Sequence, residues 1–184
     1  DTFTANQECA KRISNLIIKR KLPIKWMAMT RADAIVSRLS PSYDYSKERE
    51  LLRLAKESGC VSLAIGVESG DRAILELLNK RLDLTLLSKA RELMRDVGIQ
   101  VKYFLMVGVP CQDEASIQKT IDIIEQDRPD SINVTIIKPL PGSELFTLWL
   151  AIRKEQSKRQ KNYIFSQKEV LEIWIRVKDV FRKD

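Results

Sequence analysis

Four short runs rich in β-branched and large apolar residues alternate with longer segments in which apolar residues recur at helical spacing. The runs predict strands over 24–30, 61–67, 100–109 and 131–137. A first helix, opened by a capping-box pair of Thr4 and Gln7, is predicted before the first strand. Further helices are predicted between the strands: one over 46–58, two within 71–97 that break near Leu82 and Asp83, and one over 114–126.

A helical segment stands between each pair of predicted strands, and this order is typical of right-handed βαβ units with a parallel sheet. The predicted fold class is therefore α/β. Four strands are too few to close an eight-stranded barrel. They form part of a larger open or closed (β/α) barrel, or half of a doubly wound sheet.

The last part of the chain, 147–184, differs from the rest in its charge. Residues 151–184 contain ten Lys and Arg against five Asp and Glu, within a chain whose net charge is +7. A run of this kind is more often a solvated helix face than a nucleic-acid site, so no nucleic-acid partner is expected. Ser166 and Glu169 then open a helix whose apolar stripe predicts docking on a partner surface; the stripe consists of Val170, Ile173, Trp174, Val177, Val180 and Phe181. We interpret 147–184 as a basic helical extension of a body that covers 1–146.

Histidine is absent, and only three cysteines occur, at positions 9, 60 and 111. The lack of histidine excludes Ser/His/Asp and Cys/His nucleophiles and the usual histidine-bearing zinc and iron sites. No cysteine pair has metal-binding spacing, so no metal ligands are predicted. Widely spaced, odd-numbered thiols are typical of reduced cytosolic proteins, which predicts a cytoplasmic location. No apolar run approaches the ~20 residues that span a membrane.

Parallel sheets bind ligands at the carboxyl ends of their strands, so the residues just past each predicted strand are candidates for a site. One face of the second strand carries the small residues Ser62, Ala64 and Gly66, and it ends with Glu68. Small residues leave room for a ligand, and a carboxylate accepts hydrogen bonds from a hydroxyl pair or an ammonium group. The alternative is a purely structural ion pair with Arg31 at the neighbouring strand end, and these residues alone favour neither interpretation.

Five segments carry a family pattern in their order and spacing: 1–4 (DTFT), 26–33 (WMAMTRAD), 59–70 (GCVSLAIGVESG), 104–114 (FLMVGVPCQDE) and 139–145 (PLPGSEL). Each segment is weak alone, but the ordered set resembles the radical S-adenosylmethionine (SAM) superfamily. Within it, the set most resembles the branch whose members often carry an upstream cobalamin-binding domain. The resemblance covers roughly residues 1–146.

The resemblance implies a partial, TIM-like (β/α)6 barrel, of which this chain contains about four strands, followed by C-terminal helices. It implies an enzyme that reductively cleaves SAM at a [4Fe-4S] cluster to make a 5′-deoxyadenosyl radical, with cobalamin as a further cofactor where the upstream domain is present. In the family, a CxxxCxxC loop holds the cluster, and this loop is absent from the chain. We therefore expect the chain alone to be inactive and to require the N-terminal remainder of the enzyme.

The resemblance also implies cofactor-binding roles at the ends of the strands. Asp1 and Thr2 match the segment that helps to hold the amino group of SAM. Thr30 and Arg31 match the next strand end, where Arg31 is a candidate for the cofactor carboxylate or the substrate. Further candidates match the ribose-binding and adenine-binding positions; they are Glu68 and Ser69 for the ribose, and Phe104, Met106, Gly108 and Pro139 for the adenine. No catalytic residue is assigned.

Two other interpretations are weighed against this one. A degenerate, non-catalytic α/β scaffold or binding domain would use the helix around Trp174 as its docking face. Another α/β enzyme with a phosphate or nucleotide ligand lacks support, because neither GxGxxG nor GxxxxGK[ST] occurs. The chain also departs from the family after Pro110, where Cys111, Gln112 and Asp113 replace the usual Gly and Glu-Thr. The small-molecule substrate is not identified by the sequence.

Overall fold

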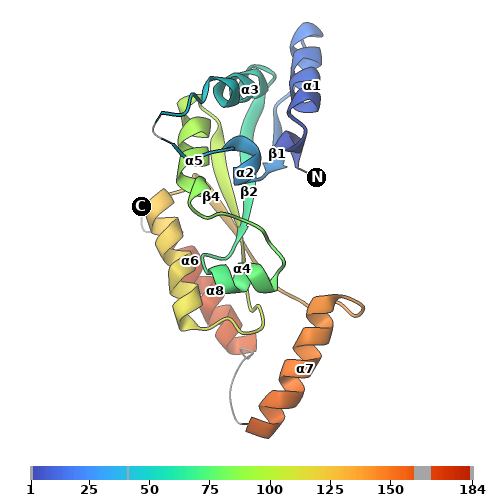
Figure 1. The fold of residues 1–184 in the computed structure, drawn as a ribbon, viewed down its shortest axis with the longest axis vertical. Helices are drawn as coiled ribbons and strands as arrows, with labels where there is room; N and C mark the ends of the chain where they lie inside the picture. Colours follow the sequence, from blue (N-terminus) through green and yellow to red (C-terminus); the bar gives the residue numbers. More distant parts are fainter. Residues whose placement is uncertain (1, 41, 160–166, 183–184) are drawn as a thin grey trace. The chain divides into compact units, whose positions relative to one another are not determined.

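The computed structural model describes residues 2–40, 42–159 and 167–182. The chain divides into two compact units, and Figure 1 labels most of their elements. The first unit comprises Asp1–Gly66, Leu82–Tyr103 and Pro129–Ser131. The second comprises Val67–Arg81, Phe104–Arg128 and Ile132–Asp184.

Four strands form one open, parallel sheet with the order β1-β2-β3-β4. The strands are β1 (Trp26–Thr30), β2 (Cys60–Glu68), β3 (Gln100–Val107) and β4 (Ser131–Ile136). β1 pairs with β2 in parallel, and Thr30 lies opposite Ile65. The predicted α/β class and its four strands are confirmed, with strand ends that differ by one or two residues from the prediction.

The strands link the two units along the chain. β1 lies in the first unit, whereas β2, β3 and β4 begin in the first unit and end in the second. Side chains alternate along β3: Val101, Tyr103, Leu105 and Val107 are fully buried, and the residues between them are half-buried. Phe104 and Met106 therefore share the half-buried face of β3. The carboxyl ends of three strands therefore belong to the second unit.

The helices of the first unit are η1 (Phe3–Ala5), α1 (Gln7–Lys19), α2 (Ala32–Ile35), α3 (Ser46–Glu57) and α5 (Leu86–Asp96). α1 packs against α3, and α5 packs against α2 and α3. The N-cap of α1 is Asn6, whose side chain accepts a hydrogen bond from the N–H of Cys9 at 2.9 Å. The predicted capping box at Thr4 is therefore wrong: Thr4 is buried within η1, one turn earlier. The short α2 was not predicted.

The helices of the second unit are α4 (Arg72–Leu77), α6 (Glu114–Asp127), α7 (Glu144–Arg159) and α8 (Gln167–Arg182). α6 and α8 lie side by side (Figure 1). Val170, Ile173 and Val177 of α8 are buried, and the indole N–H of Trp174 donates to the carbonyl oxygen of Val134 in β4 at 2.8 Å. The predicted docking of the stripe is confirmed for these residues. The predicted cap at Ser166 lies outside the described residues, as does the side chain of Phe181.

The three thiols lie in different surroundings. Cys60 is buried in β2, and burial raises the pKa of its thiol to about 11. Cys9 and Cys111 are exposed. Among the described helices, none has both the length and the apolar character needed to cross a membrane.

Candidate functional site

β2 ends at Glu68 in a strained turn. Glu68 has a φ of +65°, and the N–H of Ser69 donates to the carbonyl oxygen of Val67 at 2.9 Å. A hydrogen bond between residues i and i+2 around a positive φ is the rarer, strained type of γ-turn. Such a backbone costs about 1–3 kcal/mol in a residue other than glycine and persists only where its surroundings hold it. The carboxyl end of β2 therefore carries a carboxylate on a constrained backbone.

The side chain of Glu68 is held by Lys80. Lys80 Nζ donates to Glu68 Oε1 at 2.8 Å, and the two side chains are 20% and 15% exposed. The end of α4 fixes the backbone of Lys80 in a Schellman motif, with Asn79 at a φ of +52° and the N–H of Lys80 donating to the carbonyl oxygen of Leu75 at 2.8 Å. The cation beside Glu68 is therefore Lys80, whereas the sequence had offered Arg31.

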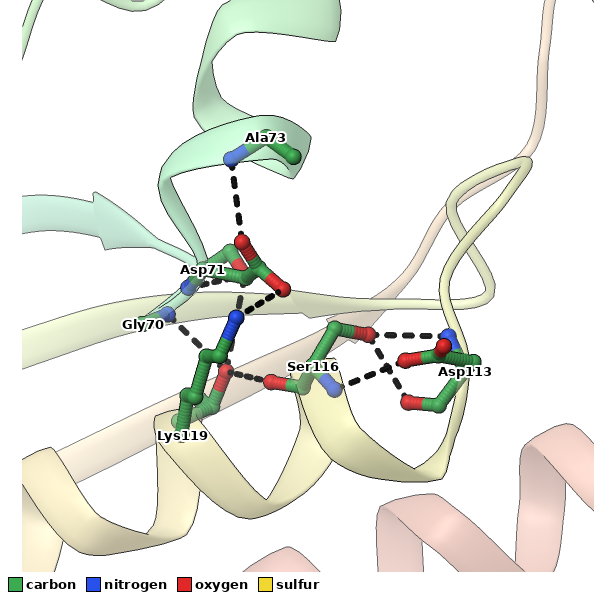
Figure 2. A network of polar contacts seen from close by, with 8 residues as sticks. Gly70, Asp71, Ala73, Asp113, Ser116 and Lys119 are labelled. Carbon is green, nitrogen blue, oxygen red and sulfur yellow. Dashed lines mark hydrogen bonds and ion pairs between the residues drawn. The ribbon is translucent and has the colours of Figure 1, made fainter.

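The chain just after Glu68 passes directly against α6. A Cβ atom on Gly70 would lie 2.3 Å from the carbonyl oxygen of Lys119, so only glycine fits there. The N–H of Gly70 donates to Thr120 Oγ1 at 2.9 Å, and this hydroxyl donates to the carbonyl oxygen of Ser116 at 3.1 Å. Figure 2 shows this network at the start of α6. The contact between backbones anchors the turn that carries Glu68.

Ser69 lies in the interior beside this contact. Its side chain is 0% exposed, and its hydroxyl accepts a hydrogen bond from the N–H of Asp71 at 3.1 Å. It also lies 3.5 Å from the hydroxyl of Thr120. Ser69 thus stabilises the turn after β2, and its assignment to the ribose stays a prediction.

Asp71 joins the start of α4 to α6. Its Oδ1 accepts from the N–H of Ala73 at 2.9 Å, and its Oδ2 accepts from Lys119 Nζ at 2.9 Å (Figure 2). Burial opposes ionisation of this carboxyl, but the hydrogen bonds from Lys119 and from the N–H of Ala73 outweigh it. The pKa of Asp71 therefore lies below its ordinary value.

Replacing Asp71 by asparagine is expected to lower the free energy of unfolding by about 1 kcal/mol at pH 7, because it removes a charged N-cap and an ion pair. An aspartate in the unfolded chain has a pKa of about 3.9, and the folded value is lower. The stabilisation is therefore fully present above about pH 5 and is lost as the pH falls through the folded pKa. Urea unfolding of wild type and D71N, at pH 7 and at decreasing pH, measures whether their free energies of unfolding become equal in acid.

The matched control is Glu172→Gln, which removes the exposed pair of Lys168 and Glu172. It should change stability little at any pH. A stability difference between wild type and D71N that stays constant into strong acid would contradict the assignment.

The end of β3 is held by Gln112, which the sequence marked only as a departure from the family. Gly108 turns the chain with a φ of +81°, and a Cβ atom there would lie 3.2 Å from Val170 Cγ1 of α8. The buried Gln112 accepts from the N–H of Gly108 at 2.8 Å and donates to the carbonyl oxygen of Met106 at 3.4 Å. A long polar side chain five residues past the strand was the available signal, but its partners are backbone groups that the sequence does not reveal.

The other candidates assigned to the adenine are half-buried. They are Phe104 and Met106 in β3 and Pro139 in the segment after β4. Strand alternation puts Phe104 and Met106 on one face, and that face continues to Gly108. The segment from Leu140 to Ser143 forms a turn in which the Ser143 hydroxyl donates to the Leu140 carbonyl at 2.7 Å. Contact of these residues with adenine stays a prediction.

In the first unit, the segment just before α1 lies beside the end of β1. Thr2 forms an isolated parallel bridge with Met29. The hydroxyls of Thr4 and Thr30 are hydrogen-bonded at 2.5 Å, and both residues are buried. Asp1 lies outside the described residues. The structure thus brings Thr2 and Thr30, two of the predicted site residues, to the same end of β1.

Arg31 follows β1 directly and forms a two-point ion pair with Asp33. Its Nε donates to Asp33 Oδ1 at 2.9 Å, and its Nη2 donates to Oδ2 at 2.7 Å. These bonds hold the pKa of Asp33 below its ordinary value. Both side chains are more than a third exposed. The pair orients the guanidinium at the carboxyl end of β1, and its role toward a carboxylate ligand stays a prediction.

The residues of this chain do not fit an iron–sulfur cluster. No group of three or more His, Cys, Asp or Glu side chains that could hold a metal ion occurs in the part of the chain that the structure describes. The three cysteines are 51 residues apart, one is buried, and no CxxxCxxC loop occurs in the 184 residues. The described residues therefore offer no ligand set for a [4Fe-4S] cluster.

The chain is similar to several known enzymes. No family model matches the chain. Over 130 residues it is 25% identical to the anaerobic magnesium-protoporphyrin IX monomethyl ester cyclase of Rubrivivax gelatinosus, covering 71% of this chain and 22% of that enzyme. Its fold matches coproporphyrinogen III oxidase (HemN) of Escherichia coli, a radical SAM enzyme, with a TM-score of 0.66 and 17% identity over 97% of this chain and 37% of HemN. The chain is a relative of the radical SAM enzymes.

A cobalamin-binding radical SAM enzyme is also among its structural neighbours. The methyltransferase TsrM of Kitasatospora setae, solved with cobalamin and a [4Fe-4S] cluster, matches with a TM-score of 0.57 and 13% identity over 74% of this chain and 26% of TsrM. The relationship that the five segments indicated is confirmed. The open four-stranded sheet corresponds to part of a radical SAM barrel, and the chain spans about a fifth of the length of the curated cyclase.

Proposed function

We propose that this chain supplies the nucleoside-binding side of a radical SAM enzyme. The observation that carries the proposal is Glu68, a half-buried carboxylate on a strained turn at the carboxyl end of β2. Radical SAM relatives share the fold, and parallel α/β sheets bind ligands at this edge. Strained backbone and a fixed carboxylate together are typical of a binding site rather than of a plain strand end.

In this proposal the residues at each strand end have an assigned role toward SAM. Glu68 accepts hydrogen bonds from the ribose hydroxyls, while Ser69 and its buried partners keep the turn in place. The half-buried face of β3 and the turn at Pro139 pack against the adenine. Thr2, Thr30 and Arg31 are directed to the amino and carboxylate groups of the cofactor.

In this proposal the reaction requires the whole enzyme. A [4Fe-4S] cluster would supply the electron for cleavage of SAM. Its cysteine ligands would lie in the N-terminal remainder of the protein, the proposed partner of this chain. An upstream domain would bind cobalamin where that cofactor is used. The substrate is a small molecule that reaches the same edge of the sheet.

Glu68→Gln tests the proposal. In the protein expressed from the whole reading frame, the variant is expected to weaken binding of S-adenosylhomocysteine by about ten- to a hundredfold, because a charged hydrogen bond contributes about 1.5–3 kcal/mol. Isothermal titration calorimetry under anaerobic conditions measures the change. The matched control is Glu76→Gln on α4, whose side chain is 71% exposed and which should bind like wild type.

Equal affinity of wild type and E68Q would overturn the role of Glu68. No binding by the wild-type protein would favour the non-catalytic scaffold instead. Iron and sulfide reconstitution gives a second arm: the whole protein is expected to form a [4Fe-4S] cluster, whereas the 184 residues alone are expected to form none. A stoichiometric cluster on the 184 residues would contradict the proposal that the cluster ligands lie in the N-terminal remainder of the enzyme.

A further inference from the structure

A buried carboxylate in the first unit has no role in the proposed SAM site. Glu48 belongs to the first turn of α3 and is 6% exposed. Its Oε1 accepts hydrogen bonds from the hydroxyls of Ser37 at 3.1 Å and Tyr43 at 3.0 Å. Its Oε2 is buried, and among the residues that the structure describes it has no hydrogen-bond partner and the carboxylate has no ion pair. One oxygen of this carboxylate is therefore removed from water without compensation.

The buried charge of Glu48 calls for a positive partner. Removal of an ionised carboxylate from water is costly unless the group is both paired and hydrogen-bonded. The N-terminus of α3 favours a negative charge, but this effect of the helix dipole is smaller than the cost of an unpaired buried charge. The two hydroxyls are neutral, so they leave the charge itself in place. A cation beside Oε2 would neutralise it.

The two hydroxyls and Glu48 Oε1 form a triangle of oxygen atoms. Ser37 Oγ also lies 3.1 Å from Tyr43 Oη, so each oxygen is within hydrogen-bond distance of the other two. Each hydroxyl has one proton, and an ionised carboxylate has none. With both protons directed to Glu48, the contact between Ser37 and Tyr43 contains no proton, and both hydroxyl oxygens keep free lone pairs. Such oxygen atoms are the ligands that hard cations prefer.

The segment that carries the two hydroxyls is also held by contacts of its own. The hydroxyl of Tyr45 donates to the carbonyl oxygen of Arg38 at 2.9 Å, and the N–H of Tyr43 donates to the carbonyl oxygen of Ser40 at 3.1 Å. The rings of Tyr43 and Tyr45 meet edge to face, with centroids 4.8 Å apart. Ser37 is exposed and Tyr43 is half-buried, so an ion from solvent can reach the cluster on this side.

We propose that Glu48, Ser37 and Tyr43 bind a monovalent alkali cation, Na⁺ or K⁺. The carboxylate supplies one negative charge, so one positive charge makes the site neutral, whereas a divalent ion would leave a net positive charge. Water completes the coordination on the exposed side of Ser37. The bound ion joins the segment between α2 and α3 to the first turn of α3. This inference is independent of the proposed SAM-binding function, because it uses none of the residues assigned to that function.

Hydrogen exchange measures binding of the cation at this place. The protein expressed from the whole reading frame is compared in NaCl, KCl and N-methylglucamine chloride at equal ionic strength, which keeps general screening the same. A ligand that binds only the folded segment slows exchange through local opening by a factor of 1 + [L]/Kd. At a cation concentration about ten times Kd, peptides that cover residues 42–52 are expected to exchange about tenfold more slowly in an alkali salt than in N-methylglucamine chloride.

Three variants locate the effect. Glu48→Gln removes the charge and is expected to abolish the dependence on alkali cations. Tyr43→Phe removes one ligand oxygen but keeps Glu48, so it is expected to raise the salt concentration needed for half-maximal protection several-fold. Glu50→Gln on the same helix, whose glutamate side chain is 61% exposed, is the matched control and should behave like wild type. Circular dichroism checks the fold of each variant, and Y43F carries the test if E48Q does not fold.

The outcomes decide the inference. Slower exchange in NaCl, in KCl or in both, lost in E48Q, supports it and identifies the ion. Equal exchange of these peptides in all three salts would overturn it and leave Oε2 to water. Slowing that E48Q retains would place the cation elsewhere and would overturn it as well. A response to calcium or magnesium chloride but to neither alkali salt would overturn the monovalent assignment.

Discussion

Replacing Gly70 by alanine is expected to lower the free energy of unfolding by about 3 kcal/mol, the upper part of the range for overpacked sites. The added Cβ would meet the carbonyl oxygen of Lys119 at 2.3 Å and the Cα atom of Thr120 at 2.7 Å. Both are backbone atoms of α6, so no side-chain rotation relieves the clash. The strand end must move away from the helix, which also breaks the hydrogen bond from the Gly70 N–H to Thr120. Urea unfolding followed by circular dichroism measures the loss.

Gly142→Ala is the matched control for Gly70→Ala. Gly142 has a φ of +89°, so alanine there is strained by its backbone, but no atom lies within 4 Å of its added Cβ. The expected cost is about 1 kcal/mol, from the backbone alone. Because Gly70 carries the turn of Glu68, G70A should also weaken nucleoside binding, whereas G142A should not. Equal stability of the two variants would show that the strand end does not approach α6 as closely as the structure has it.

The order of strands and helices could be predicted because it depends on local periodicity. The runs that became β2 and β3 consist mostly of apolar residues, and their ends shifted by no more than two residues. α2 was missed because its four residues, Ala32–Ile35, are too short to show a helical period. The start of α1 was misplaced because Thr4 pairs with Thr30, 26 residues away, which no local pattern reveals.

The sequence could predict a site residue only where that residue lies directly at the end of a strand. Glu68 could be singled out because it ends a strand, and ligand sites lie at strand ends. Its partner could not, since Lys80 lies beyond a helix and reaches Glu68 only through the cap at Asn79. The strain at Glu68 was equally hidden, because a positive φ in glutamate is imposed by tertiary contacts rather than by residue type.

Replacing Val177 by aspartate is expected to remove α8 from its docking surface. Val177 is 0% exposed in α8, which packs against α6. A carboxylate at this position would be buried without a partner, which costs about 3 kcal/mol or more unless the helix detaches. Detachment would also release the indole of Trp174 from the carbonyl oxygen of Val134 in β4. Urea unfolding measures the loss of stability, and limited trypsin digestion at Arg176 and Lys178 measures release of the helix.

Leu171→Asp separates docking from a general effect of charge on α8. Leu171 lies on the same helix but is 49% exposed, so its variant should stay within about 0.5 kcal/mol of wild type and resist trypsin as wild type does. Faster cleavage in V177D alone would make α8 part of the packed second unit, together with the strand end at Gly108, where Val170 lies. Equal behaviour of the two variants would instead make α8 a loosely attached extension. Gly108 would then lack the packing that closes one side of the proposed adenine-binding face.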